Sequence, residues 1–177
     1  MTGNEYKKLI GRYLVATFGP RGLKVYNEVS LGTSIIGKQR RTDLLMLDAH
    51  GAALAIECKY QDGAGTADEK IPYALNDMAA QRIAGVIVYA GSGFSHGVLH
   101  LLQGSELAAY CLPEPGQSSP MPRRTGAVDS GTWQLDHVVA QTFRLWDIVL
   151  GDKQPLDLQE QLSFDTAFDP ASPGTKA

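Results

Sequence analysis

Apolar residues recur along the chain with helical or alternating spacing, and this spacing predicts its helices and strands. Residues 3–18 place apolar side chains at helical intervals and end at Gly19-Pro20, a pair that stops helices. Residues 23–30 alternate as a strand does, while residues 31–40 predict a loop or a ragged extension of that strand. The later pattern predicts strands over 42–47, 52–61, 84–90 and 107–112, and helices over 67–82 (with a break near Pro72), 96–104 and 135–150.

A short loop ending in Gly51 joins the second and third predicted strands. A three-residue loop whose last residue is glycine is a common hairpin connection. This connection pairs residues whose numbers sum to 100, so Asp43 faces Glu57 across the hairpin. Because strand side chains alternate between the two faces, Lys59 and Gln61 share the face of Glu57.

The order of elements is helix, three strands, helix, strand, helix. It predicts an α/β (α+β mixed) fold with a central mixed β-sheet flanked by helices on both faces. Residues 1–150 predict one domain. Within it, residues 113–132 are rich in Pro, Gly and Ser and predict a long loop. Residues 151–177 predict an irregular or disordered acidic tail.

Charge is unevenly distributed along the chain. The net charge is −3, and residues 151–177 carry five acids and two bases, which leaves 14 bases and 14 acids in residues 1–150. This weak acidity does not exclude a nucleic-acid partner, although a basic pI, which would support such a partner, is absent. Apolar runs are too short to cross a membrane and no apolar leader is visible, so we expect a soluble cytoplasmic protein. Cys58 and Cys111 are too widely spaced to predict a disulfide framework, and Cys58, within an apolar run, is expected to be a buried thiol.

The hairpin concentrates the residues that carry chemistry. Asp43 and Glu57 offer the oxygen ligands that Mg²⁺ prefers, and the backbone carbonyl of Cys58 is a third candidate ligand. Lys59 can orient an attacking water or neutralise charge on a phosphate, and Gln61 can hydrogen-bond either one. The alternative is a solvated ladder of ion pairs. Against it, Glu57 and Lys59 lie within an apolar strand, where charged side chains need a partner or a metal.

The sequence Thr42-Asp43, thirteen residues and then Glu57-Cys58-Lys59 resembles the PD-(D/E)XK nuclease superfamily, which includes type II restriction enzymes. The resemblance covers about residues 3–92 and implies a restriction-endonuclease-like core of helix, hairpin, helix and strand. Thr42 stands where the family has proline. The family's first-helix glutamate corresponds to Glu5 as a further catalytic residue, and Glu28 competes with Glu5 for that role.

Four basic residues are candidates for binding nucleic acid: Lys38, Arg40, Arg41 and Lys70. They could grip backbone phosphates, or they could be exposed residues without a ligand.

The sequence and the resemblance together predict a Mg²⁺-dependent endodeoxyribonuclease that is restriction- or homing-endonuclease-like and acts on double-stranded DNA. Mn²⁺ is expected to replace Mg²⁺. A single cleavage centre cuts both strands only in a symmetric assembly, so we expect a homodimer or a higher homo-oligomer. Two alternatives stay open. One is a structure-specific nuclease, such as a junction resolvase or a phage recombination or repair nuclease. The other is a non-catalytic nucleic-acid-binding module on the same fold.

Overall fold

The computed structural model describes residues 1–63, 67–120 and 131–156. In chain order its elements are α1 (Gly3–Phe18), the 3-10 turn η1 (Gly19–Arg21), β1 (Lys24–Thr33), β2 (Gln39–Leu47), β3 (Ala53–Tyr60), α2 (Ala67–Ala79), β4 (Ala84–Ala90), α3 (His96–Gln103), β5 (Ala108–Tyr110), α4 (Trp133–Phe143) and α5 (Asp147–Leu150).

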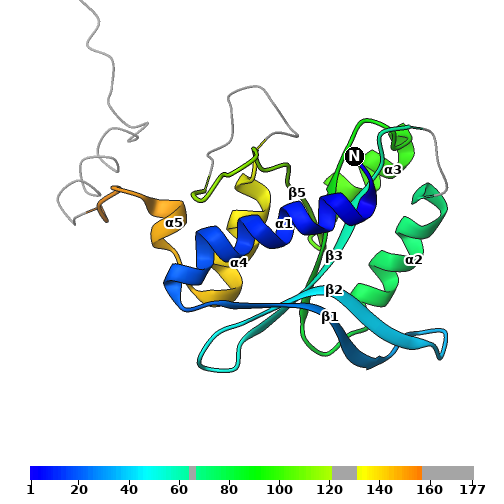
Figure 1. Ribbon diagram of the computed structural model, residues 1–177, viewed down its shortest axis with the longest axis horizontal. Helices are drawn as coiled ribbons and strands as arrows, with labels where there is room; N and C mark the ends of the chain where they lie inside the picture. The colour runs from blue at the N-terminus through cyan, green and yellow to red at the C-terminus, as the bar shows by residue number, and fades with distance from the viewer. Residues whose placement is uncertain (64–66, 121–130, 157–177) are drawn as a thin grey trace, which may run out of the picture.

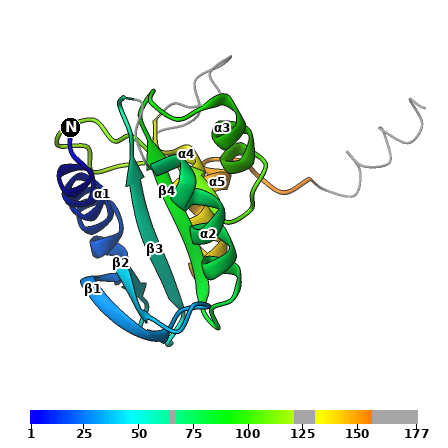
Figure 2. The same cartoon turned by 90° about the vertical axis from the view of Figure 1, so that its right-hand side faces the viewer.

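The strands form one mixed sheet in the order β1-β2-β3-β4-β5. The pairs β1–β2 and β2–β3 are antiparallel, whereas β3–β4 and β4–β5 are parallel. Helices cover both faces of the sheet, as the sequence predicts, with α1 on one side and α2 on the other (Figures 1 and 2). The predicted α/β fold, a central mixed sheet with helices on both faces, is therefore confirmed.

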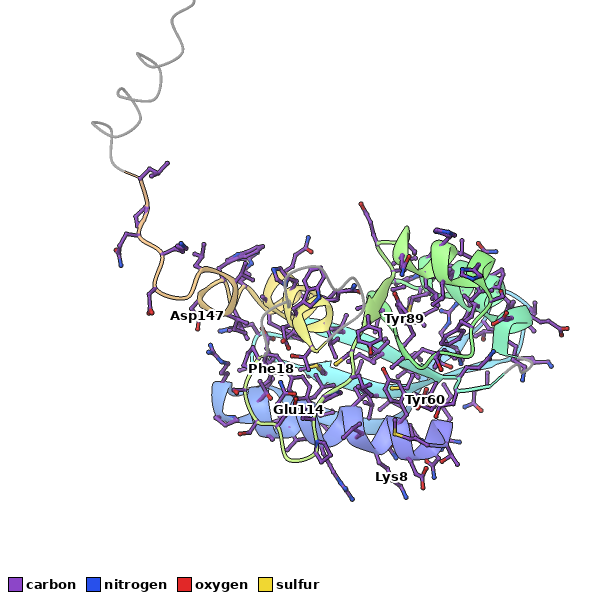
Figure 3. All side chains as sticks on the ribbon, turned by 90° about the horizontal axis from the view of Figure 1, so that it is seen from above. Lys8, Phe18, Tyr60, Tyr89, Glu114 and Asp147 are labelled. Atoms are coloured by element: carbon purple, nitrogen blue, oxygen red, sulfur yellow. The ribbon has the colours of Figure 1, made fainter. Side chains whose placement is uncertain are left out.

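Each face of the sheet has its own core because side chains alternate along the strands. On the α1 side, Ile56 and Val88 pack with side chains of α1 and α4. On the opposite side, Ile87 and Tyr89 pack with α2 and α3. Figure 3 shows Tyr60 on the α1 side of the sheet and Tyr89 toward α3. Odd-numbered residues at the end of β3 therefore face α2 and α3.

The β2–β3 hairpin has the register that the sequence predicts. Its four ladder pairs run from Leu44–Ile56 to Leu47–Ala53, and in each pair the residue numbers sum to 100. Gly51 has a φ of +87° at the turn, which glycine adopts without a steric penalty. The Asp48 carboxylate accepts two amide hydrogen bonds that close the loop, each 2.8 Å long.

The ragged strand extension predicted over 31–40 is confirmed, because β1 continues to Thr33, a turn follows, and β2 begins at Gln39. These strand ends and the turn between them are called the β1–β2 arm (residues 30–42). Two predictions about individual elements need correction. Pro72 lies inside α2 without breaking it. The single helix over 135–150 is wrong: Arg144 takes a left-handed φ of +59° and ends α4, and α5 follows as a separate turn.

Other expectations are confirmed or stay open. Cys58 and Cys111 are buried free thiols. No helix in the described part of the chain is long and apolar enough to cross a membrane. The predicted loop over 113–132 falls partly on residues outside the described ranges, and so does most of the predicted tail.

Candidate active site

The site forms where β2 and β3 stop pairing regularly. The ladder ends at Leu44–Ile56, one position before Asp43 and Glu57. Beyond that pair, the Cys58 amide donates to Asp43 Oδ2 at 2.8 Å instead of to a backbone carbonyl. The hydroxyl of Thr42 donates to the Ile56 carbonyl at 2.9 Å. At this point, hydrogen bonds between side chains of β2 and the main chain of β3 take the place of backbone–backbone hydrogen bonds.

Glu57 and Lys59 form an ion pair on the face that α2 covers. Lys59 Nζ lies 2.7 Å from Glu57 Oε1, and the two side chains are 23% and 26% exposed. Burial raises the pKa of Glu57, Lys59 opposes this rise, and the charge of Asp43 adds to it. The backbone of Asp43 lowers the pKa of Glu57. The two acids are thus close enough to affect each other, and the Asp43 carboxylate accepts a hydrogen bond from the main chain of β3.

A cleft of about 380 Å³ opens beside this ion pair, between the β1–β2 arm and α2. Glu57 and Lys59 line it, and so do all four basic residues that the sequence singles out for nucleic-acid binding: Lys38, Arg40, Arg41 and Lys70. Its charged lining consists of these five cations with the carboxylates of Glu57 and Asp77, a net charge of +3. Asp43 does not line the cleft, since its carboxylate points to the Cys58 amide.

Asp77 of α2 holds the β1–β2 arm in place. Arg40 donates two hydrogen bonds to the Asp77 carboxylate, at 2.8 and 3.0 Å, and the Ile35 amide adds a third at 2.9 Å. The hydrogen bond from Arg40 is the main cause that lowers the pKa of Asp77. Arg40 is therefore committed to the wall of the cleft, whereas Lys38 and Lys70 form no ion pair with any described residue.

Glu28 occupies the position opposite Asp43 on β1, and its backbone is unusual. The β1–β2 pairing is regular on both sides of this position but skips it, and Glu28 has a φ of +56°. Non-glycine residues rarely adopt this conformation. Its carboxylate receives Lys7 Nζ at 2.7 Å and also Arg41. The Lys7 hydrogen bond is the main cause that lowers the pKa of Glu28.

Glu5 and Gln61 have other partners in the structure. The Glu5 carboxylate accepts the Thr2 amide at 2.7 Å in a capping box at the start of α1. The Gln61 side chain donates to the Gly93 carbonyl at 2.7 Å and to Asp68 at 3.3 Å, and its Oε1 is buried with no partner among the described residues. Gln61 thus ties the end of β3 to the loop after β4. Catalytic roles for both residues stay predictions.

The donor set fits a hard divalent cation. Asp43, Glu57 and the Cys58 carbonyl belong to one stretch of hairpin, and two carboxylates suffice for an ion that keeps several waters. Burial is the main cause that raises the pKa of Glu57, and the nearby charge of Asp43 adds to it. Within the described residues, no group of three or more His, Cys, Asp or Glu side chains is arranged to hold a metal. Water or substrate oxygens would complete the coordination.

Sequence reasoning missed three residues that shape the site. Thr42 was treated only as a departure from a family pattern, and Lys7 and Asp77 were not singled out. The contacts of Lys7 and Asp77 join residues 21 and 37 positions apart, so no local spacing reveals them. A buried hydroxyl next to Asp43 could have been suspected from the apolar strand that follows Thr42.

Comparisons with known proteins place the chain in a family. No curated protein matches it. Two solved structures resemble it distantly. One is an EndoMS complex with double-stranded DNA (TM-score 0.36, 20% identity, 62% of this chain), of which the chain spans only 44%. The other is the SPO1766 protein of unknown function from Silicibacter pomeroyi (TM-score 0.40, 14% identity, 88% of this chain and 97% of that one). The model of the PD-(D/E)XK nuclease superfamily domain matches residues 2–146, well past the segment 3–92 that the motif suggested, and the chain therefore belongs to the PD-(D/E)XK nuclease superfamily.

Proposed function

We propose that this protein is a Mg²⁺-dependent endonuclease that hydrolyses phosphodiester bonds in double-stranded DNA. The observation that carries the proposal is the position of the Glu57–Lys59 pair, next to Asp43 and on the wall of a cleft with a net charge of +3. A polyanionic substrate is attracted to such a cleft even though the whole chain carries −3. Family membership supplies the nuclease class independently of this geometry.

Asp43, Glu57 and the Cys58 carbonyl would hold the metal ion. A bound divalent cation lowers the pKa of water and neutralises charge on a phosphate. Because the donors are all oxygens, Mn²⁺ is expected to serve as well as Mg²⁺. Compensation of the Glu57 charge by a metal would release the Lys59 ammonium from its 2.7 Å contact. Lys59 could then donate a hydrogen bond to a phosphate oxygen or to the attacking water.

The remaining cations would position the DNA backbone. Lys38 on the arm and Lys70 on α2 stand on opposite walls of the cleft and make no ion pair with described residues, so they can meet phosphates directly. Arg40 and Arg41 already bond to Asp77 and Glu28. We propose that these two arginines mainly stabilise the conformation of the β1–β2 arm and contribute to the positive electrostatic potential around it.

Cutting both strands requires two centres, and we propose a homodimer. Large apolar side chains are exposed in and around α5: Trp146 just before it is 49% exposed, Leu150 at its end 53%, and Leu156 after it 60%. Exposed apolar patches on soluble domains often mark association surfaces. A cytoplasmic location remains the expectation from the sequence.

A plasmid-cleavage assay tests the proposal. Wild-type protein with Mg²⁺ is expected to nick or linearise supercoiled DNA, and EDTA to stop it. Glu57→Gln and Lys59→Ala are each expected to reduce the rate by about 100-fold or more, since each removes a group that acts in the transition state. Glu106→Gln and Lys153→Ala are the matched controls, because both residues are exposed and do not line the cleft.

Metal-dependent cleavage that persists in both active-site variants would refute the site assignment. The absence of cleavage on every DNA form, combined with tight DNA binding, would instead favour the non-catalytic binding module. Preferential cleavage of branched over linear duplexes would favour a structure-specific nuclease.

A further inference from the structure

The turn at the tip of the β1–β2 arm presents two adjacent isoleucines to solvent. Ile35 and Ile36 are 50% and 57% exposed, although turn positions usually carry Gly, Pro, Asn, Asp or Ser. Figure 1 shows the arm extending below α2 at the edge of the molecule. Large apolar side chains that stay exposed side by side often belong to a binding surface, so the tip is a candidate binding element.

The tip is an ordered turn. The Ser34 amide donates to the Lys38 carbonyl at 2.7 Å, and the Gly37 amide donates to the Ser34 carbonyl at 3.0 Å. Gly37 has a φ of +76°, which glycine adopts without a steric penalty. The Ile35 amide also donates to Asp77 of α2 at 2.9 Å. The isoleucines are therefore held in place before a ligand binds, which reduces the entropic cost of binding through them.

The two isoleucines differ in their relation to the cleft beside Glu57. Ile36 lines this cleft together with Lys38 and Lys59, whereas Ile35 is not one of its lining residues. A ligand that occupies the cleft therefore meets the side chain of Ile36. Ile35 serves the arm mainly through its main chain, which is bonded to α2.

The charges around the tip favour a polyanionic ligand. Residues 29–42 contain Lys38, Arg40 and Arg41 and no acidic residue, and the cleft that Ile36 lines carries a net charge of +3. A DNA duplex matches this charge and also offers an apolar surface, the stacked faces of its bases. Isoleucine is one of the residues that DNA-binding proteins insert between base pairs. A second copy of the arm is disfavoured, since like charges would meet.

The length of the arm limits where along the DNA an insertion can occur. Ile36 precedes Asp43 by seven residues, so the tip lies at most about 23 Å from Asp43 at roughly 3.3 Å per residue. Neighbouring base pairs are about 3.4 Å apart along the helix axis, so this reach spans about seven base pairs. Ile36 can therefore reach only base pairs that lie close to the proposed cleavage centre.

We propose that Ile36 is an apolar wedge, which inserts between two neighbouring base pairs of the bound duplex and unstacks them within about seven base pairs of the cleavage point. This inference rests on the proposed nuclease function and deepens it, because it makes the deformability of the DNA part of substrate choice. Pyrimidine–purine steps unstack most easily. They are therefore the expected positions of insertion.

The test measures unstacking with 2-aminopurine, a base whose fluorescence increases when it leaves the stack. The probe is a G·C-rich duplex of about 16 base pairs with the label at the adenine of one central TA step, so that the step stays within reach of the tip. Measurements are made in EDTA, where the probe stays intact, at protein concentrations that saturate binding by anisotropy. Wild-type protein is expected to raise the fluorescence about twofold or more. The same label inside a run of purines is expected to change less.

Ile36→Ala is expected to lose the fluorescence increase while it still saturates the probe, because the methyl group is too short to enter the stack. Ile36→Leu should keep the increase. Ile35→Ala is the matched control, since it removes the same side chain from the neighbouring position outside the cleft, and it should also keep the increase. Because both isoleucines are exposed, these substitutions should preserve the fold, which circular dichroism and urea unfolding check.

Three results overturn the proposal. The first is a wild type that saturates the probe without changing its fluorescence. The second is an increase that Ile36→Ala leaves intact or that Ile35→Ala removes equally, since insertion of Ile36 would then not be its cause. The third is self-association that Ile36→Ala abolishes, since a second copy would then cover the tip.

Plasmid cleavage by the wild type separates the two levels of inference. Normal Mg²⁺-dependent cleavage without any fluorescence increase removes only the wedge. Absence of both cleavage and DNA binding removes the proposed function and the wedge with it.

Discussion

The carboxylate of Glu57 lies in a partly buried position that disfavours its charged form. Burial raises its pKa, and the neighbouring Lys59 does not fully offset that effect. Sites of this kind exchange stability for reactivity, because a charge that is poorly compensated in the free protein binds a cation strongly. The same residue should therefore report on both folding and metal binding.

We expect Glu57→Gln to make the metal-free protein more stable at neutral pH while it abolishes cleavage. An acid whose folded-state pKa is raised contributes its stability below the unfolded pKa and loses it as pH rises through the folded pKa. The uncharged Gln is free of this loss. Urea unfolding in EDTA should show the variant more stable above the folded pKa of Glu57, and the two proteins alike in acid, below the ordinary glutamate pKa.

Adding Mg²⁺ should stabilise the wild type and leave Glu57→Gln much less affected, since only the native site binds the ion. Glu106→Gln serves as the control and should follow the wild type throughout. A variant less stable than wild type at neutral pH in EDTA would show that the Lys59 ion pair outweighs the cost of burial.

At the scale of elements, the hairpin was predictable from sequence because its signals are local. Gly51 at the turn and the alternation of side chains fix the register, and the register makes Asp43 and Glu57 neighbours. The ragged extension of β1 was predicted, but the anchoring of the β1–β2 arm to α2 was not, because it depends on the contacts of Arg40 and Ile35 with Asp77. The break after α4 was equally hidden, since nothing in the local pattern marks Arg144 as left-handed.

The close approach of β3 to the loop after β4 gives a sharp test at this scale. Gly91 has a φ of +111°, and a Cβ there would lie 2.2 Å from the Gln61 carbonyl oxygen. Gly91→Ala is expected to destabilise the fold by about 2 kcal/mol or more, from backbone strain and from displacement of the β3 end. Urea unfolding measures the change.

Gly97 supplies the matched control. It lies inside α3, where a Cβ would meet nothing within 4 Å, so Gly97→Ala should be neutral or stabilising by up to about 1 kcal/mol. If both substitutions have the same effect, the contact between Gln61 and Gly91 does not constrain the end of β3.

At the scale of the whole molecule, the proposed dimer makes a distinct prediction. Trp146→Asp with Leu150→Asp should convert a dimer to a monomer, because each change puts a charge into an apolar interface. Sedimentation velocity gives the state of association. The same double variant should nick supercoiled plasmid while it loses most double-strand cleavage.

Leu101→Asp is the control, since Leu101 is 42% exposed on α3 and lies on a different element. It should leave association unchanged. A wild type that remains monomeric at high concentration, with or without DNA, would contradict the proposed assembly.

The charged lining of the cleft has a consequence for the way the molecule meets its substrate. With +3 in the cleft and −3 overall, the rest of the chain carries −6 and is repelled by a polyanion. Encounters in which the cleft faces the phosphates are therefore favoured, and these are already aligned with the hairpin that carries Glu57 and Lys59. Raising the ionic strength should accordingly slow productive encounters, an effect that the net charge of the whole chain does not predict.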